Sequence, residues 1–267
     1  MGGLVLLAII ASVVVSAVAN PAQYKPKIEK AFHEATGYEL KIGGDIGVSL
    51  LPLPKAYVED VRVSNGSKEL ASVKQINIYP QLLPLLSGEK KISSILVLEP
   101  VISLEKTETG SNWVNNNQVA AKESGGSGSN ISINKLKIED GKAQYIDRVS
   151  GKSHIIDKIN VEASLASSNG PFNLNGDLVY NNLPMQVKTS VSNISDKAAG
   201  PKLFASIEAD TTKLNFEGTK AGGKLVLSSQ DLSSLLAAVG SKNSMVAGKT
   251  VSFDGNVTKQ DNIIRIS

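Results

Sequence analysis

The sequence predicts a mainly β protein that begins with a short helical region. After Gly37, apolar and polar residues alternate with a period of two over most of the chain, as in strands with one apolar and one solvated face. Turn-forming residues such as Asn65-Gly66 and Ser168-Asn169-Gly170-Pro171 separate these stretches. Helical spacing is confined to segments near the N-terminus and near residue 235. These observations favour a strand-rich fold with few helices.

Residues 2–19 form an apolar N-terminal segment that carries no charge. As a helix, the segment would be roughly 27 Å long, close to the hydrocarbon thickness of about 30 Å. We therefore expect a transmembrane anchor at residues 1–19. The alternative is a cleaved signal peptide that ends at Ala17-Val18-Ala19. The lysines that follow, Lys25, Lys27 and Lys30, would by charge alone keep the body of the protein in the cytoplasm.

A short amphipathic helix is predicted between Gln23 and Thr36, with Gly37 suited to end it. Its apolar face consists of Tyr24, Ile28, Ala31, Phe32 and Ala35, at three- and four-residue spacing. We expect this face to pack as core at the end of the sheet. The alternative is that the helix lies on a bilayer surface.

The predicted strands fall on both sides of a low-complexity segment at residues 115–130, which is rich in Asn, Gly and Ser. We expect a β region at 20–114, a flexible loop at 115–130 and a continuing antiparallel β region at 131–267. Gly176, Gly218 and Gly255 end a recurring apolar-x-apolar-x-Gly pattern, which predicts bends where a sheet curls. A second helix is predicted at Asp231–Val239, with Leu232, Leu235, Leu236 and Val239 on one face.

Composition gives little support to catalysis, metal binding or nucleic-acid binding. The chain has a net charge of +3, without a basic stripe, and it has no cysteine. The two histidines, His33 and His154, lack neighbours at metal-ligand spacing, so we expect both at the solvated surface. The adjacent carboxylates Glu59-Asp60 and Glu139-Asp140 should point to opposite faces of their strands. We therefore predict no enzyme activity, catalytic residues, metal site or cofactor.

A set of Pro, Gly and Trp motifs between residues 20 and 114 resembles the N-terminal region of the AsmA family. The segments that carry the resemblance are Asn20-Pro21-Ala22-Gln23-Tyr24, Thr36-Gly37-Tyr38-Glu39-Leu40, Lys41-Ile42-Gly43-Gly44-Asp45, Leu51-Pro52-Leu53-Pro54, Leu82-Leu83-Pro84-Leu85-Leu86-Ser87-Gly88, Glu99-Pro100-Val101 and Gly110-Ser111-Asn112-Trp113. The resemblance implies an inner-membrane protein with a single N-terminal anchor and a periplasmic body. It also implies a curved antiparallel β-sheet, or half-barrel, whose apolar groove carries phospholipids toward the outer membrane.

Periodicity alone leaves three ways to cover the apolar strand faces: another sheet, the sheet curling on itself, or a bound apolar ligand. It favours the first, a β-sandwich with a dry core. The resemblance favours a groove that binds acyl chains. The groove candidates, offered as one face of each strand, are Ile76, Ile78, Leu96, Leu98, Ile131, Ile133, Phe172, Leu174, Leu178, Leu203, Ile207, Phe216 and Phe253.

Two functions follow from these two folds. The first is a protein of the cell envelope that binds phospholipids. The alternative is a membrane-tethered scaffold or assembly factor for outer-membrane protein biogenesis. Expected partners are phospholipids, the inner membrane and an outer-membrane or envelope protein, without nucleic acid.

Overall fold

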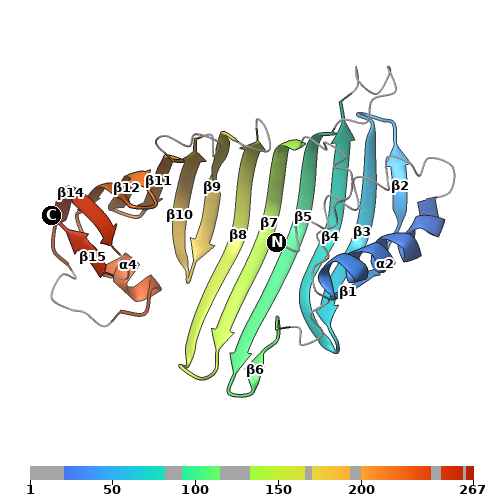
Figure 1. The fold of residues 1–267 in the computed structure, drawn as a ribbon, viewed down its shortest axis with the longest axis horizontal. Coiled ribbons are helices and arrows are strands. Elements are labelled where there is room, and N and C mark those ends of the chain that lie inside the picture. Colours follow the sequence, from blue (N-terminus) through green and yellow to red (C-terminus); the bar gives the residue numbers. More distant parts are fainter. Residues whose placement is uncertain are drawn as a thin grey trace. The chain divides into compact units, whose positions relative to one another are not determined.

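A computed structural model describes residues 21–81, 92–114, 133–165, 170–192, 200–241, 248–260 and 263–267 (Figure 1). The fold is mainly β with few helices, as predicted. Contacts divide the chain into two compact units, Met1–Ile155 and Ile156–Ser267, called unit 1 and unit 2 below. Each unit is built on an open, curved run of paired strands.

Unit 1 begins with the turn η1 (Pro21–Tyr24) and the helix α2 (Lys25–Thr36). Its strands are β1 (Glu39–Ile42), β2 (Ile46–Ser49), β3 (Lys55–Asn65), β4 (Lys68–Pro80), β5 (Ile92–Thr107), β6 (Gly110–Ser111) and β7 (Ile133–Asp147). They pair in the order β1-β3-β4-β5-β7, while β2 also pairs with β3 and β6 with β5.

Strand β8 (Lys152–Leu165) begins in unit 1 and continues into unit 2. The other elements of unit 2 are β9 (Phe172–Tyr180), β10 (Leu183–Val191), β11 (Leu203–Ala209), β12 (Thr212–Thr219), β13 (Gly222–Ser229), α4 (Ser233–Ala238), β14 (Val251–Gln260) and β15 (Ile263–Ile266). These strands pair in sequence order, each antiparallel to the next. Short connections between consecutive strands favour this arrangement.

Helix α2 closes the core of unit 1, which confirms the first role expected for it. Ile28 and Phe32 are 0% and 2% exposed and pack against apolar residues of β1 to β5. Figure 1 shows the helix lying across the strands at this end of the unit. Gly37 ends the helix with φ 74° and donates its N–H to the carbonyl of His33, as the sequence predicted. Full burial of these side chains contributes about 1.5–3 kcal/mol each.

Two N-terminal predictions have different outcomes. The amphipathic helix is present, at Lys25–Thr36. Among the residues that the structure describes, no helix is long and apolar enough to cross a membrane. The predicted anchor at residues 1–19 and the predicted loop at 115–130 lie outside those residues.

The prediction of an entirely antiparallel sheet is wrong at one place, because β5 and β7 pair in parallel. Their register runs from Ile92 opposite Ile133 to Lys106 opposite Asp147. A parallel neighbour requires the chain to return to the same end of the sheet, and the stretch between Ser111 and Ile133 is long enough to do so.

A row of left-handed backbone positions crosses the strands of unit 1. Asp60, Glu99 and Asp140 have φ of 47°, 47° and 52°, although none is glycine. The register places Asp60 opposite Lys74, Lys74 opposite Glu99, and Glu99 beside Asp140. We call these four residues the crease. Each left-handed position costs about 1 kcal/mol, so packing elsewhere in the unit must hold the backbone there.

At the crease, the two-residue alternation of buried and exposed side chains is interrupted and resumes one position later. In β3, Val58 and Val61 are both 0% exposed although three positions separate them, and Asp60 lies between them. The Gly43-Gly44 pair lies against this point, with the N–H of Gly43 bonded to the carbonyl of Asp60 at 2.8 Å. A Cβ at Gly44 would meet the Glu59 backbone at 2.9 Å. The family-like Gly-Gly motif therefore fits a close backbone approach.

Candidate functional site

One face of unit 2 is apolar from β8 to β14. Directly paired residues of neighbouring strands lie on the same face of a sheet. Phe172 pairs with Val191, Val191 with Leu203, and Ala205 with Phe216, which pairs in turn with Leu225. The members of this apolar face are Val161, Ala163, Phe172, Leu174, Leu178, Met185, Val187, Val191, Leu203, Ala205, Ile207, Leu214, Phe216, Leu225, Leu227, Phe253 and Val257.

The apolar face has little cover of its own. Most of its residues are half-buried, and Ile207 is 37% exposed. Among the described residues of unit 2, the buried apolar side chains are Leu183, Ala209, Leu232 and Ala238. These lie in or beside α4, or in the strand ends that pack near it. The helix therefore closes one end of the face, while the middle of each strand keeps exposed hydrocarbon.

Helix α4 is shorter than predicted, and one of its expected contacts is wrong. It spans Ser233–Ala238, and Leu235 packs in the small cluster with Leu183 and Ala209. Val239, predicted on the apolar side, is instead 52% exposed. The helix ends at Ala238, so Val239 no longer follows the helical face.

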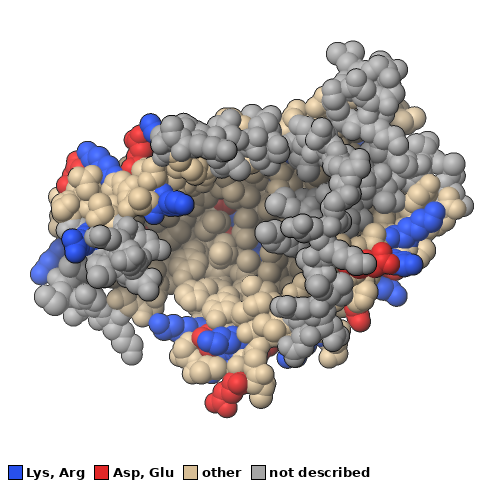
Figure 2. Space-filling model, in the orientation of Figure 1, with Lys and Arg blue, Asp and Glu red and all other residues tan. Residues whose placement is uncertain are grey.

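The opposite face of unit 2 is polar and charged. Lys213 and Glu208 pair at 2.5 Å, and Lys224 and Asp254 at 3.0 Å, all with exposed side chains. Figure 2 shows charged side chains along the outer part of β11 to β14. Because exposed pairs of this kind contribute little to stability, their main effect is to keep this face solvated.

The sequence-predicted candidates divide between several places. Those in unit 2 share the apolar face: Phe172, Leu174, Leu178, Leu203, Ile207, Phe216 and Phe253. In unit 1, Ile76 and Ile78 are 1% and 0% exposed in the core beneath α2.

Leu96 and Leu98 correct the prediction that all candidates share one face. Ile76 pairs with Val97, whereas Leu96 pairs with Asn77 and Leu98 with Gln75, so both leucines lie on the other side. The physical reason is the two-residue period, in which a shift of one position reverses the face. Ile131 lies outside the described residues, and Ile133 is the first residue of β7.

Glycines bring the strands of unit 2 close together. Gly218 pairs with Gly223, and a Cβ on Gly218 would lie 2.5 Å from the Gly223 Cα. A Cβ on Gly176 would lie 2.6 Å from the Val161 Cα, next to a register shift in β8. Gly176 and Gly218, singled out by the recurring pattern, therefore mark close backbone contacts.

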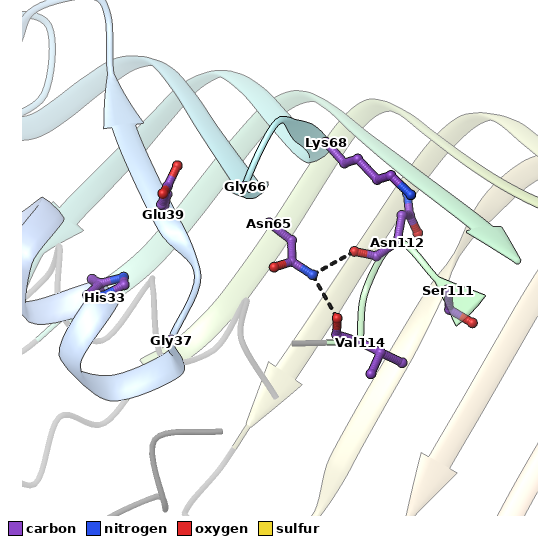
Figure 3. A pocket seen from close by; sticks show the side chains of 9 residues that line it. All are labelled: His33, Gly37, Glu39, Asn65, Gly66, Lys68, Ser111, Asn112 and Val114. Atoms are coloured by element: carbon purple, nitrogen blue, oxygen red, sulfur yellow. Dashed lines mark hydrogen bonds between the residues drawn. The ribbon is translucent and has the colours of Figure 1, made fainter. Parts of the chain in front are cut away.

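A separate cavity of about 340 Å³ lies in unit 1, near the turn between β3 and β4 (Figure 3). Asn65 points toward the segment after β6 and donates through Nδ2 to the carbonyls of Asn112 and Val114, both at 2.9 Å. Asn112 is 8% exposed and donates to the Ser103 carbonyl at 2.9 Å. These bonds hold the connecting segment in place.

The Gly-Ser-Asn-Trp motif has a structural role in this segment. The Tyr38 hydroxyl donates to the Trp113 carbonyl at 2.6 Å. The Trp113 ring lies 5.8 Å from that of Tyr145, and Tyr145 stacks on His154 at 6.0 Å. His33 is exposed as predicted, but His154 is half-buried because of this stack. Through these contacts, Trp113 connects the segment after β6 to Tyr38, just before β1, and to Tyr145 in β7.

The described residues hold no group of three or more His, Cys, Asp and Glu that could bind a metal ion. Two of the shifted pKa values, those of Asp147 and Asp231, follow from local turns. The Ser150 N–H lowers the pKa of Asp147, and the Ser233 hydroxyl lowers that of Asp231. Each carboxylate accepts backbone hydrogen bonds that hold a turn or the start of α4.

The AsmA family model matches residues 1–260 of this chain. The chain belongs to the AsmA family. The match agrees with the motifs between residues 20 and 114 and continues through both units. A comparison with curated proteins found no match.

Proposed function

We propose that this AsmA-family protein binds phospholipids by their acyl chains on the apolar face of unit 2. The observation that supports this most directly is the apolar face from β8 to β14, in which Thr189 is a polar position between Leu174 and Ala205 and which α4 covers at one end only. Family membership is consistent with a role in lipid transport or envelope assembly.

The chemistry of the face suits acyl chains. Its residues are aliphatic and aromatic, and the paired charges Lys213–Glu208 and Lys224–Asp254 belong to the opposite face. Burial of methylene groups contributes about 0.8 kcal/mol each, so affinity requires few polar contacts. In this proposal the protein is anchored in the inner membrane by its N-terminus and conveys phospholipids through the periplasm toward the outer membrane.

The test is site-specific photocrosslinking in cells at two phenylalanine positions. Phe216 lies on the apolar face, whereas Phe204 pairs with Glu217 on the opposite face and is 39% exposed. Benzoylphenylalanine replaces each in the full-length chain, and lipid adducts are identified by mass spectrometry. We expect phospholipid adducts from position 216 and none from 204.

Two results would contradict the proposal. One is the absence of lipid adducts at 216 together with lipid-free protein after purification without detergent. The other is equal labelling from both positions, which would indicate unspecific contact with membranes. Protein adducts at 216 in place of lipid would favour a scaffold for outer-membrane protein biogenesis.

A further inference from the structure

The turn between β2 and β3 carries the most exposed large apolar side chains of the described residues. Leu50, Leu51 and Leu53 are 70%, 82% and 58% exposed. They are consecutive apart from Pro52, and Pro54 follows them. A cluster of this kind on a turn is typical of a surface that contacts a membrane or a partner. We call the three leucines the leucine tip.

The backbone holds the leucine tip in a defined place. Strands β2 and β3 pair from Ile46 opposite Val58 to Ser49 opposite Lys55, so the turn is short and both of its ends are fixed. The Ser49 hydroxyl donates to the Leu51 carbonyl at 2.9 Å. The leucines therefore project from an ordered hairpin in which Ile46 and Val58 are buried and Val48 is 40% exposed.

The tip lies close to the point where the chain enters the fold. Turn η1 contacts β2, the strand that leads into the tip. Residues 2–19, which directly precede this region, carry no charge and are long enough for a hydrophobic span. The leucines and the apolar N-terminal segment are thus attached to the same part of unit 1.

Basic residues lie on the helix that follows η1 and directly after the tip. Lys27 and Lys30 are exposed on α2, and Lys55 follows the tip. Figure 2 shows basic and acidic side chains together over α2, where Lys30 pairs with Glu34 at 3.7 Å. Exposed leucines with nearby lysines match a bilayer interface, where apolar groups enter the acyl region and cations stay at anionic headgroups.

We propose that Leu50, Leu51 and Leu53 insert into the interface of an anionic phospholipid bilayer and hold unit 1 against the membrane. This contact rests on the membrane attachment in the proposed function, but it does not depend on acyl chains binding to unit 2. Its consequence is that an N-terminal anchor would be joined by a second, shallow contact.

The experiment uses the absence of cysteine in the natural sequence. The full-length chain carries one cysteine at a time, Leu51→Cys or Thr109→Cys, labelled with an environment-sensitive fluorophore. Thr109 is an exposed residue in the turn between β5 and β6. The strand register places that turn at the opposite end of the unit 1 strands. Each protein is reconstituted into vesicles of phosphatidylethanolamine and phosphatidylglycerol, with and without lipids that carry a spin-label quencher near the headgroup.

We expect blue-shifted emission and quenching at position 51, and solvent-like, unquenched emission at 109. The quenching should weaken when phosphatidylglycerol is replaced by phosphatidylcholine. Solvent-like emission at 51 would overturn the proposal, as would equal quenching at both positions. A blue shift without quenching would also overturn it, because another protein surface would then cover the tip. The crosslinking at Phe216 is read separately, so either proposal can fail while the other stands.

Discussion

The two units use the same strand alternation but complete their apolar faces differently. In unit 1, α2 places Ile28 and Phe32 on the sheet, and the core beneath includes Val58, Ile78 and Ile95 at 0% exposure. In unit 2, the short helix α4 covers one end, and the strand centres remain half-buried. The comparison teaches that alternation builds an apolar face, whereas a covering helix decides whether that face becomes core.

The largest expected effect is in the closed core. Phe32→Ala should lower the free energy of unfolding of unit 1 by about 3–5 kcal/mol, because it leaves a cavity in a fully buried site. Phe216→Ala in unit 2 should cost about 1 kcal/mol, because a half-buried ring gives up only part of its transfer free energy. Hydrogen exchange read by mass spectrometry separates the units. Equal losses of unfolding free energy in the two variants would contradict the difference between a closed core in unit 1 and an open face in unit 2.

Gly218→Ala tests whether the strands of unit 2 are closely packed against each other even though their apolar face is partly exposed. The new methyl group would meet the Gly223 backbone, so we expect a loss of about 1–3 kcal/mol. Asn215→Ala, on the same strand but facing the opposite side, is the control and should have little effect. Denaturant unfolding monitored by exchange in β12 and β13 measures both. If alanine is tolerated at 218, the strands themselves are loosely packed.

Asn112→Ala removes the side-chain hydrogen bonds that hold the segment after β6 against β5 in unit 1. The side chain accepts from the Glu105 N–H at 2.8 Å and donates to the Ser103 carbonyl, and its loss leaves both groups without this partner. We expect a cost of about 1–3 kcal/mol. Trp113 is the sole tryptophan, so its fluorescence reports this segment directly. Thr109→Ala in the nearby turn serves as the control, and a similar loss there would refute the assignment.

Asp140→Gly should be about 1 kcal/mol less destabilising than glycine at an ordinary strand position, because glycine adopts φ 52° without steric cost and this relief offsets its added chain entropy. Asp177→Gly in β9 is the matched control. Its backbone has no positive φ, so glycine should destabilise unit 2 through added chain entropy. Thermal unfolding with unit-specific exchange measures the two changes. Equal destabilisation by both variants would show that the crease is not strained.

The smallest expected effect is a pH dependence of the stability of helix α4, which covers one end of the apolar face of unit 2. Hydrogen bonds from the Ser233 hydroxyl and from backbone N–H groups lower the pKa of Asp231. A lowered pKa in the folded state means that the stabilisation is present above the usual aspartate range and is lost as pH falls through the lowered value. Exchange in α4 should therefore increase at acid pH. Asp231→Asn should show a weaker pH dependence, and an unchanged profile would contradict this role for the carboxylate.

Sequence reasoning found the residues of unit 2 more accurately than those of unit 1. Phe172, Phe216 and Phe253 lie on uninterrupted alternation, so one correct register places all three on one face. In unit 1 the buried positions of β5 are Ile95 and Val97, so Leu96, one position away, falls on the face opposite Ile76. Met185 and Leu225, which belong to the apolar face, were missed although the same alternation contains them.

The sequence by itself determined the family, the mainly β class, helix α2 and its end at Gly37, because these depend on local periodicity and on residues with special backbone freedom. Only the tertiary structure decided the parallel pairing of β5 with β7, the aligned left-handed positions of the crease, and the burial of Ile76 and Ile78 beneath α2. Each of these depends on contacts between residues far apart in the chain, and local alternation is the same whether a face is covered or open.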